Sequence, residues 1–355
     1  MACQAGEQSV EESAAVEVNK ATEAVDTLKY DEEVHLKNVR QLTFGGDNAE
    51  AYFSFDNRQL IFQRTGEEYS LECDQIFIGD LENEDFESNM VSTGLGRTTC
   101  SYFLPGDSLV LFASTHLSAD ECPQNEHMHD ARQYLWPIFD SYEIFVADLE
   151  GNIVSQLTDN EFYDAEATVS AQGDKIVFTS NRSGDLELYT MNVDGSDVQQ
   201  ITSGLGYDGG AFFSPDGSKL VFRASRPEKV EDQTKYNNFL AKGLVAPSNM
   251  EIYVCNSDGS DLNKVTDLGN ANWAPFFHPS GEKIIFCSNH ASERGFPFNL
   301  FMINTDGSEL EQITFDDRFD SFPMFSFDGK QLAFCSNRNN GGTRATNIFI
   351  ADWVD

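Results

Sequence analysis

The sequence has little positive charge, because 23 Lys and Arg residues stand against 59 Asp and Glu residues and the net charge is -36. A protein that binds nucleic acid needs a basic surface that displaces counterions from the phosphates. The composition therefore excludes nucleic acid as a partner. It favours a partner that is cationic, neutral or bridged by a metal ion over an anionic one.

The sequence also lacks the marks of three other classes of protein. No segment approaches the roughly 18 to 20 consecutive apolar residues that a membrane-spanning helix needs. The seven Cys residues are odd in number and too dilute for a scaffold built from disulfides. The pentapeptide G-x-S-x-G of α/β-hydrolases does not occur, which argues against a serine peptidase of that type. Apolar residues, in contrast, make up 40% of the chain and include 29 Phe, enough for a large core.

An eleven-residue pattern occurs six times along the chain. Each copy has two apolar runs joined by a turn of Pro, Asp, Gly or Asn, and the second run ends in Phe, which predicts a β-hairpin. The copies are residues 52–62, 102–112, 168–178, 212–222, 276–286 and 324–334.

A second hairpin follows each copy and is clearest from residues 186, 250 and 299 onward, where an Asp-Gly turn joins two apolar runs. Six units of four antiparallel strands are typical of an all-β fold, the six-bladed β-propeller. Insertions at 116–141 and 226–249 interrupt two units. Without them, each unit has about 45 residues, the usual length of a four-stranded blade.

The two ends of the chain complement each other. The last unit stops after its third strand, at residues 347–355, and lacks a fourth, whereas residues 35–43 have the ending of a fourth strand but no preceding hairpin of their own. We therefore expect the N-terminal strand to complete the last blade and close the ring, which hides two sheet edges. The predicted domains are a flexible acidic tether at 1–33 and a propeller at 34–355.

The repeats resemble a known family. The run S-P-D-G-x-x-L-V-F at 214–222 and the run Y-V-x-N-x-D-G-S-D-L-x-x-V-T at 253–266 resemble the TolB-like propeller repeat of bacterial envelope proteins. Related repeats occur in the propeller domains of prolyl-oligopeptidase-type peptidases and in oligogalacturonate lyases. The resemblance covers residues 34–355 and implies a propeller fold and a place in the bacterial envelope, either periplasmic or anchored to the outer membrane. It does not specify an activity, because propellers serve both binding modules and enzymes.

Short polar residues enter the innermost strand of each blade, four positions before each eleven-residue copy. One interpretation is that they cap the entry turn through bonds to the backbone. The other is a polar ring at the channel mouth that binds a cation, a polar ligand or a peptide end. These residues are Asn48, Thr98, Asp164, Asp208, Asn272 and Asp320.

Glu166 lies two residues nearer the channel than Asp164, so two carboxylates approach one mouth, and Gly209 and Gly210 leave room in the next blade. Both insertions are second-to-third-strand loops and share the face of this mouth. The second insertion is expected to carry a short amphipathic helix. The predicted ligand- or partner-binding residues are Asp164, Glu166, Asp208, Asn272 and Asp320, with Trp136 and Tyr236 as aromatic contacts.

The resemblance to oligogalacturonate lyases implies one metal site, because those enzymes hold a metal with propeller histidines. The candidate ligands of a divalent metal here are His116, His127, His129 and His290. The alternative is that these side chains are solvated or structural, since the blades that carry them are not adjacent. No other cofactor is predicted.

The cysteines fall into two groups. Cys255, Cys287 and Cys335 lie inside strands and are expected to be buried. Cys100 and Cys122 belong to the same blade and are predicted to form a disulfide if the protein is exported.

Cys3 follows Met1 and Ala2 and resembles the end of a bacterial lipoprotein signal whose apolar part is absent, which makes it a candidate for lipidation. If the written N-terminus is the natural one, the protein is expected to be cytoplasmic instead.

The leading prediction is a monomeric, non-catalytic binding or scaffold propeller of the envelope. Its insertion-bearing face displays polar loops to a protein, peptide or glycan partner. The alternative is a metal-dependent carbohydrate lyase or hydrolase with its site at the channel mouth and Glu166 as the base.

Overall fold

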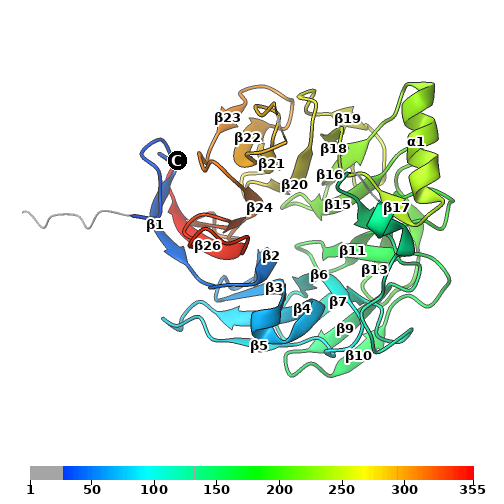
Figure 1. Ribbon diagram of the computed structural model, residues 1–355, viewed down its shortest axis with the longest axis horizontal. Coiled ribbons are helices and arrows are strands. Elements are labelled where there is room, and N and C mark those ends of the chain that lie inside the picture. The colour runs from blue at the N-terminus through cyan, green and yellow to red at the C-terminus, as the bar shows by residue number, and fades with distance from the viewer. Residues whose placement is uncertain (1–26, 131–132, 294) are drawn as a thin grey trace, which may run out of the picture.

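The structure is a computed structural model and describes residues 27–130, 133–293 and 295–355. Figure 1 shows six four-stranded sheets arranged around a central axis, and all strand pairs within the sheets are antiparallel. The predicted six-bladed β-propeller is confirmed. In the described residues, no helix is long and apolar enough to cross a membrane.

The blades follow one another in chain order. The first three consist of β2 (Asp47–Phe53), β3 (Gln59–Gly66), β4 (Leu71–Asp80) and β5 (Ser88–Met90); β6 (Thr98–Phe103), β7 (Leu109–Ser114), β9 (Glu143–Asp148) and β10 (Ile153–Gln156); and β11 (Asp164–Val169), β12 (Lys175–Ser180), β13 (Glu187–Asn192) and β14 (Gln199–Gln200).

The other three consist of β15 (Asp208–Phe213), β16 (Lys219–Ser225), β18 (Met250–Asn256) and β19 (Asn263–Lys264); β20 (Asn272–Phe277), β21 (Lys283–Ser288), β22 (Asn299–Asn304) and β23 (Glu311–Gln312); and β24 (Asp320–Phe325), β25 (Gln331–Ser336), β26 (Asn347–Trp353) and β1 (Leu36–Gln41).

The turn of the eleven-residue repeat explains why the inner hairpins form. In blade four, the Ser214 hydroxyl donates to Asp216 at 2.6 Å and accepts from the backbone N–H of Lys219 at 3.0 Å. Gly217 then takes a positive φ of 74°, which glycine adopts without strain. The Phe that ends each copy is fully buried in all six blades.

The ring closes as predicted, because β1 pairs with β26 from Leu36 opposite Trp353 to Gln41 opposite Phe349. The packed structure begins before residue 34, however. Glu33, assigned above to the tether, is fully buried and its carboxylate lies 2.9 Å from the Arg338 guanidinium. The propeller boundary is therefore earlier than the sequence suggested, because this carboxylate compensates a buried cation.

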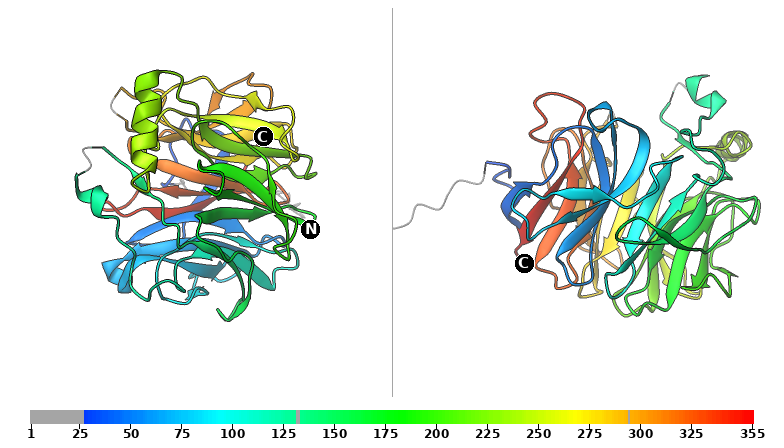
Figure 2. Two further views of the ribbon diagram at one scale, coloured as in Figure 1. Left: turned by 90° about the vertical axis from the view of Figure 1, so that its right-hand side faces the viewer. Right: turned by 90° about the horizontal axis from the view of Figure 1, so that it is seen from below.

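Both insertions leave from second-to-third-strand connections and rise from the same face of the ring (Figure 2). The first contains a 3-10 turn at Glu126–Asp130 and β8 (Trp136–Pro137); the second contains α1 (Val230–Leu240), the expected helix, and β17 (Leu244–Val245). β8 pairs with β17, so the insertions of blades two and four join across blade three.

Candidate functional site

The six polar entry residues are all fully buried and stand at or near the start of the inner strands. In three blades the entry residue is an Asp that binds an Arg located 18 residues later, just after the second strand. These Asp–Arg pairs are Asp164–Arg182 at 2.8 Å, Asp208–Arg226 at 2.8 Å and Asp320–Arg338 at 2.7 Å.

The amide entry residues make equivalent bonds to the backbone of neighbouring segments. Asn272 donates to the Met250 carbonyl at 2.8 Å and accepts from the Ser288 hydroxyl at 2.6 Å. Asn48 donates to the Thr346 carbonyl at 3.0 Å. Of the two interpretations made from the sequence, capping fits this geometry. These side chains are buried inside the blades and do not stand at an open channel mouth. In that position they satisfy buried donors and acceptors.

A second ring of residues, two positions further along each inner strand, does face the channel. Each of the six has a positive φ between 48° and 59° and sits at a β-bulge, and all six line one cavity. A left-handed backbone is costly for residues other than glycine, and bulges of this kind re-aim side chains at functional sites. This bulge ring consists of Glu50, Cys100, Glu166, Gly210, Ala274 and Phe322.

Glu166 is the hub of a buried polar network in the bulge ring. Its carboxylate accepts from the Tyr207 hydroxyl at 2.7 Å, from Arg223 at 2.9 Å and from the Tyr163 hydroxyl at 3.2 Å. The predicted role of glycine in making room here fits the geometry. A Cβ on Gly210 would lie 2.2 Å from an Arg223 nitrogen.

Glu50 faces this network from blade one. Its pKa is raised to about 7 by burial, an effect that a hydrogen bond from the Cys100 thiol and the charge of Arg223 oppose. Burial also raises the pKa of the Cys100 thiol well above its usual value. The thiol is therefore protonated at neutral pH, which makes it a poor nucleophile.

Aromatic side chains of the inner strands pack together next to the bulge ring. The Tyr52 ring packs edge-on against Phe212 at 5.4 Å and lies 5.8 Å from Tyr102. Phe276 extends the layer, at 5.1 Å from Phe212. Tyr52 and Phe212 also line the cavity within the bulge ring, and we call this cavity the channel well.

Trp136, a predicted aromatic contact, lies at the mouth of the channel well. The Arg223 guanidinium carbon lies 5.0 Å from the centre of a Trp136 ring, and Trp273 lies 5.5 Å from it. The strand pairing between β8 and β17 holds Trp136 in this position, opposite Val245. An insertion therefore covers part of the mouth.

A second hollow lies on the insertion-bearing face and has a volume of about 410 Å³. Its walls are Ile138 and Asp140 of the first insertion, Asn181 of blade three, and Asn237 and Leu240 of α1. We call it the insertion groove. The sequence did not predict it, because it exists only where the two insertions meet.

Tyr236, the other predicted aromatic contact, acts as a tie between α1 and blade three. Its hydroxyl hydrogen-bonds the Asp185 carboxylate. Tyr236 also packs against the same buried hydrophobic cluster as Trp136 and Phe139. This residue therefore positions the helix that forms one wall of the insertion groove.

The candidate metal ligands whose side chains the structure describes, His116, His127 and His290, do not form a metal site. His116 of blade two and His290 of blade five each bond a serine of their own strand, at 3.0 and 2.9 Å, and each ring packs against a Phe. His127 lies 3.7 Å from Glu126 in the first insertion, and the side chain of His129 lies outside the described part. Across the described residues, no three His, Cys, Asp or Glu side chains are placed to hold a metal ion.

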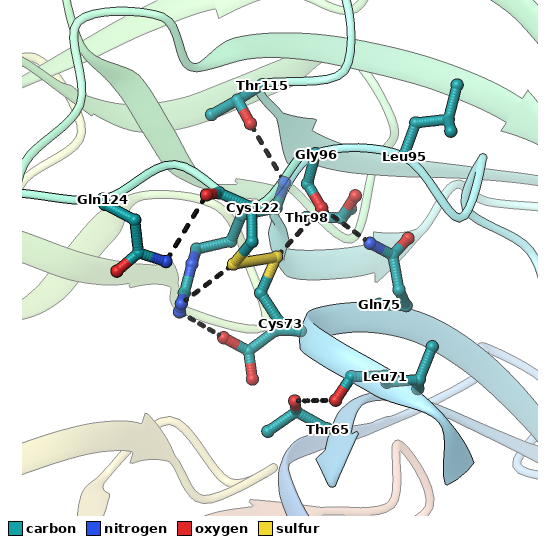
Figure 3. Close-up of a disulfide and its surroundings, with 12 residues drawn as sticks. Thr65, Leu71, Cys73, Gln75, Leu95, Gly96, Thr98, Thr115, Cys122 and Gln124 are labelled. Carbon is teal, nitrogen blue, oxygen red and sulfur yellow. Dashed lines mark hydrogen bonds and ion pairs between the residues drawn. A yellow bond between two sulfur atoms is a disulfide. The ribbon is translucent and has the colours of Figure 1, made fainter. Parts of the chain in front are cut away.

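The prediction that Cys100 and Cys122 form a disulfide is wrong. Cys122 bonds with Cys73 of β4, with 5.9 Å between the Cα atoms (Figure 3), and Cys100 is free. The bulge turns Cys100 toward the channel, whereas β4 of blade one lies beside the first insertion. The bond thus joins two blades. Cys3, the lipidation candidate, lies outside the described residues.

A comparison with protein-family models gives one match, between residues 139–238 and the TolB beta propeller domain. The matched segment runs from the end of the first insertion through blade three to α1. A comparison with curated proteins found no match.

Solved structures resemble the whole ring. A putative TolB from Agrobacterium tumefaciens is 16% identical with a TM-score of 0.57, and the match covers 89% of this chain and 97% of that one. TolB from Acinetobacter baumannii is 15% identical with a TM-score of 0.55, over 84% of this chain and 64% of that one.

An oligogalacturonate lyase in complex with manganese is 14% identical with a TM-score of 0.51, over 89% of this chain and 93% of that one. Likeness at these identities shows the fold alone. The chain is thus a six-bladed β-propeller, and its residues 139–238 match the TolB beta propeller domain.

Proposed function

We propose that this propeller is a non-catalytic binding module that holds a peptide segment of a protein partner in the insertion groove. The observation that carries the proposal is the pairing of β8 with β17, which builds a groove of about 410 Å³ from two insertions. That volume falls within the usual range of ligand pockets. Rigid blades hold the walls in place, so binding needs little ordering of the protein.

The chemistry of the groove favours a neutral or cationic peptide. Asp140 is exposed and offers a carboxylate oxygen beyond the one that accepts from Asn181 at 2.8 Å. Asn237 is exposed on α1 and offers both a donor and an acceptor. Such groups pair with backbone amides, and the net charge of -36 steers cationic segments toward the surface.

A place in the bacterial envelope is part of the proposal. The TolB-like repeat supports it, and so does the Cys73–Cys122 disulfide, because such bonds persist in oxidising compartments such as the periplasm.

The test compares two neighbouring Asn→Trp variants of α1 for capture of proteins from envelope extract of the native host. Asn237 lines the groove, whereas the adjacent Asn238 is exposed and does not. We expect Asn237→Trp to fill the groove and abolish capture, while Asn238→Trp captures as the wild type does. Equal capture by both variants, or capture that survives protease treatment of the extract, would contradict a peptide partner at this groove.

A further inference from the structure

The channel well contains polar atoms that the described protein leaves without partners. Three atoms of residues that line this cavity are buried and make no hydrogen bond there: Arg223 Nε, which can only donate, and Glu50 Oε2 and Ser101 Oγ, which can accept. Ser101 is only 2% exposed and lines the same cavity as Glu50 and Cys100. Buried polar groups normally have a partner, so the two acceptors point to an occupant of the cavity.

The space and the charge define what this occupant is. The cavity has a volume of about 20 Å³, which holds one group the size of a water molecule. The carboxylate of Glu166 already accepts from two hydroxyls and from Arg223, so these charges compensate each other. Glu50 adds a carboxylate that forms no ion pair with any described residue, although the charge of Arg223 acts on it. A small cation that donates hydrogen bonds would satisfy both its charge and its free oxygen.

We propose that the channel well binds one primary ammonium group, as carried by a lysine side chain or by the amino terminus of a peptide. The identification of the source as a peptide rests on the proposed function, but the site is separate from the insertion groove. An ammonium group has three donors and no acceptor. The Glu50 carboxylate and the Ser101 hydroxyl accept two of its hydrogen bonds, and the Cys100 sulfur is a weak third acceptor.

Other small cations fit this site less well. A guanidinium group is larger than one water molecule. A tightly held metal ion needs three or more protein ligands, and no such set of His, Cys, Asp and Glu exists among the residues that the structure describes.

Binding is expected to depend on pH through Glu50. The charged or titratable groups that act on this carboxyl are Cys100 of β6, Glu166 of β11, Arg223 of β16 and Asp74 of β4. Burial raises the pKa of Glu50 to about 7, so a fall in pH below that value protonates the carboxyl. Ammonium binding then weakens, because the neutral acid no longer compensates the cation.

The experiment measures binding of three short peptides to the full chain by calorimetry at about pH 8, above the raised pKa. The first is acetyl-Gly-Lys-Gly-amide, which has only a side-chain ammonium; the second is its Nε-acetyl form, which has none; the third is Gly-Gly-Gly-amide, which has only a terminal ammonium. We expect the first or the third to bind, according to the source, and the second not to bind.

Glu50→Gln is expected to weaken ammonium binding about tenfold or more, because it removes the charged acceptor. The matched control is Glu67→Gln, which alters an exposed carboxylate and should bind as the wild type does. If Glu50→Gln does not fold, Ser101→Ala provides the same test through the second acceptor. Equal binding by the site variants and the wild type, or no binding of either ammonium peptide by folded wild-type protein, would overturn the proposal in favour of a water molecule.

The groove variant separates this inference from the proposed function. Asn237→Trp should leave ammonium binding at the channel well unchanged, since the residue lines only the insertion groove. Loss of partner capture with intact ammonium binding therefore supports both sites independently. Intact capture with no ammonium binding would refute the channel site alone.

Discussion

A buried aspartate pairs with an arginine at equivalent positions of blades three, four and six, and only in blade six is the arginine buried as well. The blade-six pair has an additional member. Arg338 binds both Asp320 of the inner strand, at 2.7 Å, and Glu33 of the N-terminal segment, at 2.9 Å. All three side chains are at most 3% exposed. A buried cation of this kind is the main compensation for two carboxylates, so its removal leaves both uncompensated.

Arg338→Met is therefore expected to lower the free energy of unfolding by about 3–5 kcal/mol. Arg318→Met is the matched control, because Arg318 pairs with Asp317 at the surface, where the side chains are 51% and 91% exposed. The control should change stability by at most about 1 kcal/mol. Urea unfolding of both variants measures the difference, and similar values for the two would contradict the compensating role of Arg338.

Glu50 should give the stability of the propeller a pH dependence. The pKa of this carboxyl is about 7 in the folded protein but about 4.3 in an unfolded chain. Between these values the folded state binds the proton more tightly, so the free energy of unfolding falls as the pH rises. Glu50→Gln cannot ionise and should lose less stability than the wild type between about pH 4.5 and 7.5.

Urea unfolding at several pH values across this window checks the prediction. Glu67→Gln, which alters an exposed carboxylate, should follow the wild-type curve. Parallel curves for Glu50→Gln and the wild type would show that the Glu50 carboxyl titrates normally.

At the scale of strands and loops, the sequence predicts the hairpins, but of the bulge ring it places only Glu166 and Gly210 at the channel. The repeated turn and the Phe that ends each copy predict the inner hairpins, and the entry residues are recognisable because all of them are short and polar. The bulge ring shares no such character, because its members range from Gly210 to Phe322. A bulge shifts the alternation of strand faces by one residue, so strand alternation alone does not identify the other four channel-facing side chains.

The insertions show the same limit. The expected helix in the second insertion was readable from apolar spacing, whereas the pairing of β8 with β17 depends on the distance between blades two and four. No local pattern indicates that Cys73 is the partner of Cys122, because the two lie 49 residues apart and in different blades. Such contacts follow from the closed ring and not from local patterns.

The Cys73–Cys122 disulfide should stabilise the junction of blade one with the first insertion. Cys122→Ser is expected to lower the free energy of unfolding by about 2–4 kcal/mol. Reduction of the wild type with dithiothreitol should have the same effect, and reduction of the variant should have none. Non-reducing peptide mapping gives the direct check, and a peptide that links Cys100 to Cys122 would refute the pairing.

At the scale of the whole molecule, the ring depends on a strand from the far end of the chain. β1 covers the outer edge of β26 and lies in the same sheet as β24 and β25. A chain that lacks residues 1–41 is expected to aggregate or to lose its cooperative unfolding transition, because the edge of β26 becomes exposed. Size-exclusion chromatography and thermal unfolding test this, and an unchanged monomer with wild-type stability would refute the closure.

The join between the two insertions also determines where the ring tolerates new chain ends. Consider circular permutants in which the natural ends are linked and the backbone is opened between two blades. An opening between blades three and four leaves the new seam bridged by β8 and β17, because this pair spans blade three from both sides. Within the described residues, an opening between blades five and six has no such bridge. The Cys73–Cys122 disulfide adds the junction of blades one and two, so the reinforced arc of the propeller runs from blade one to blade four.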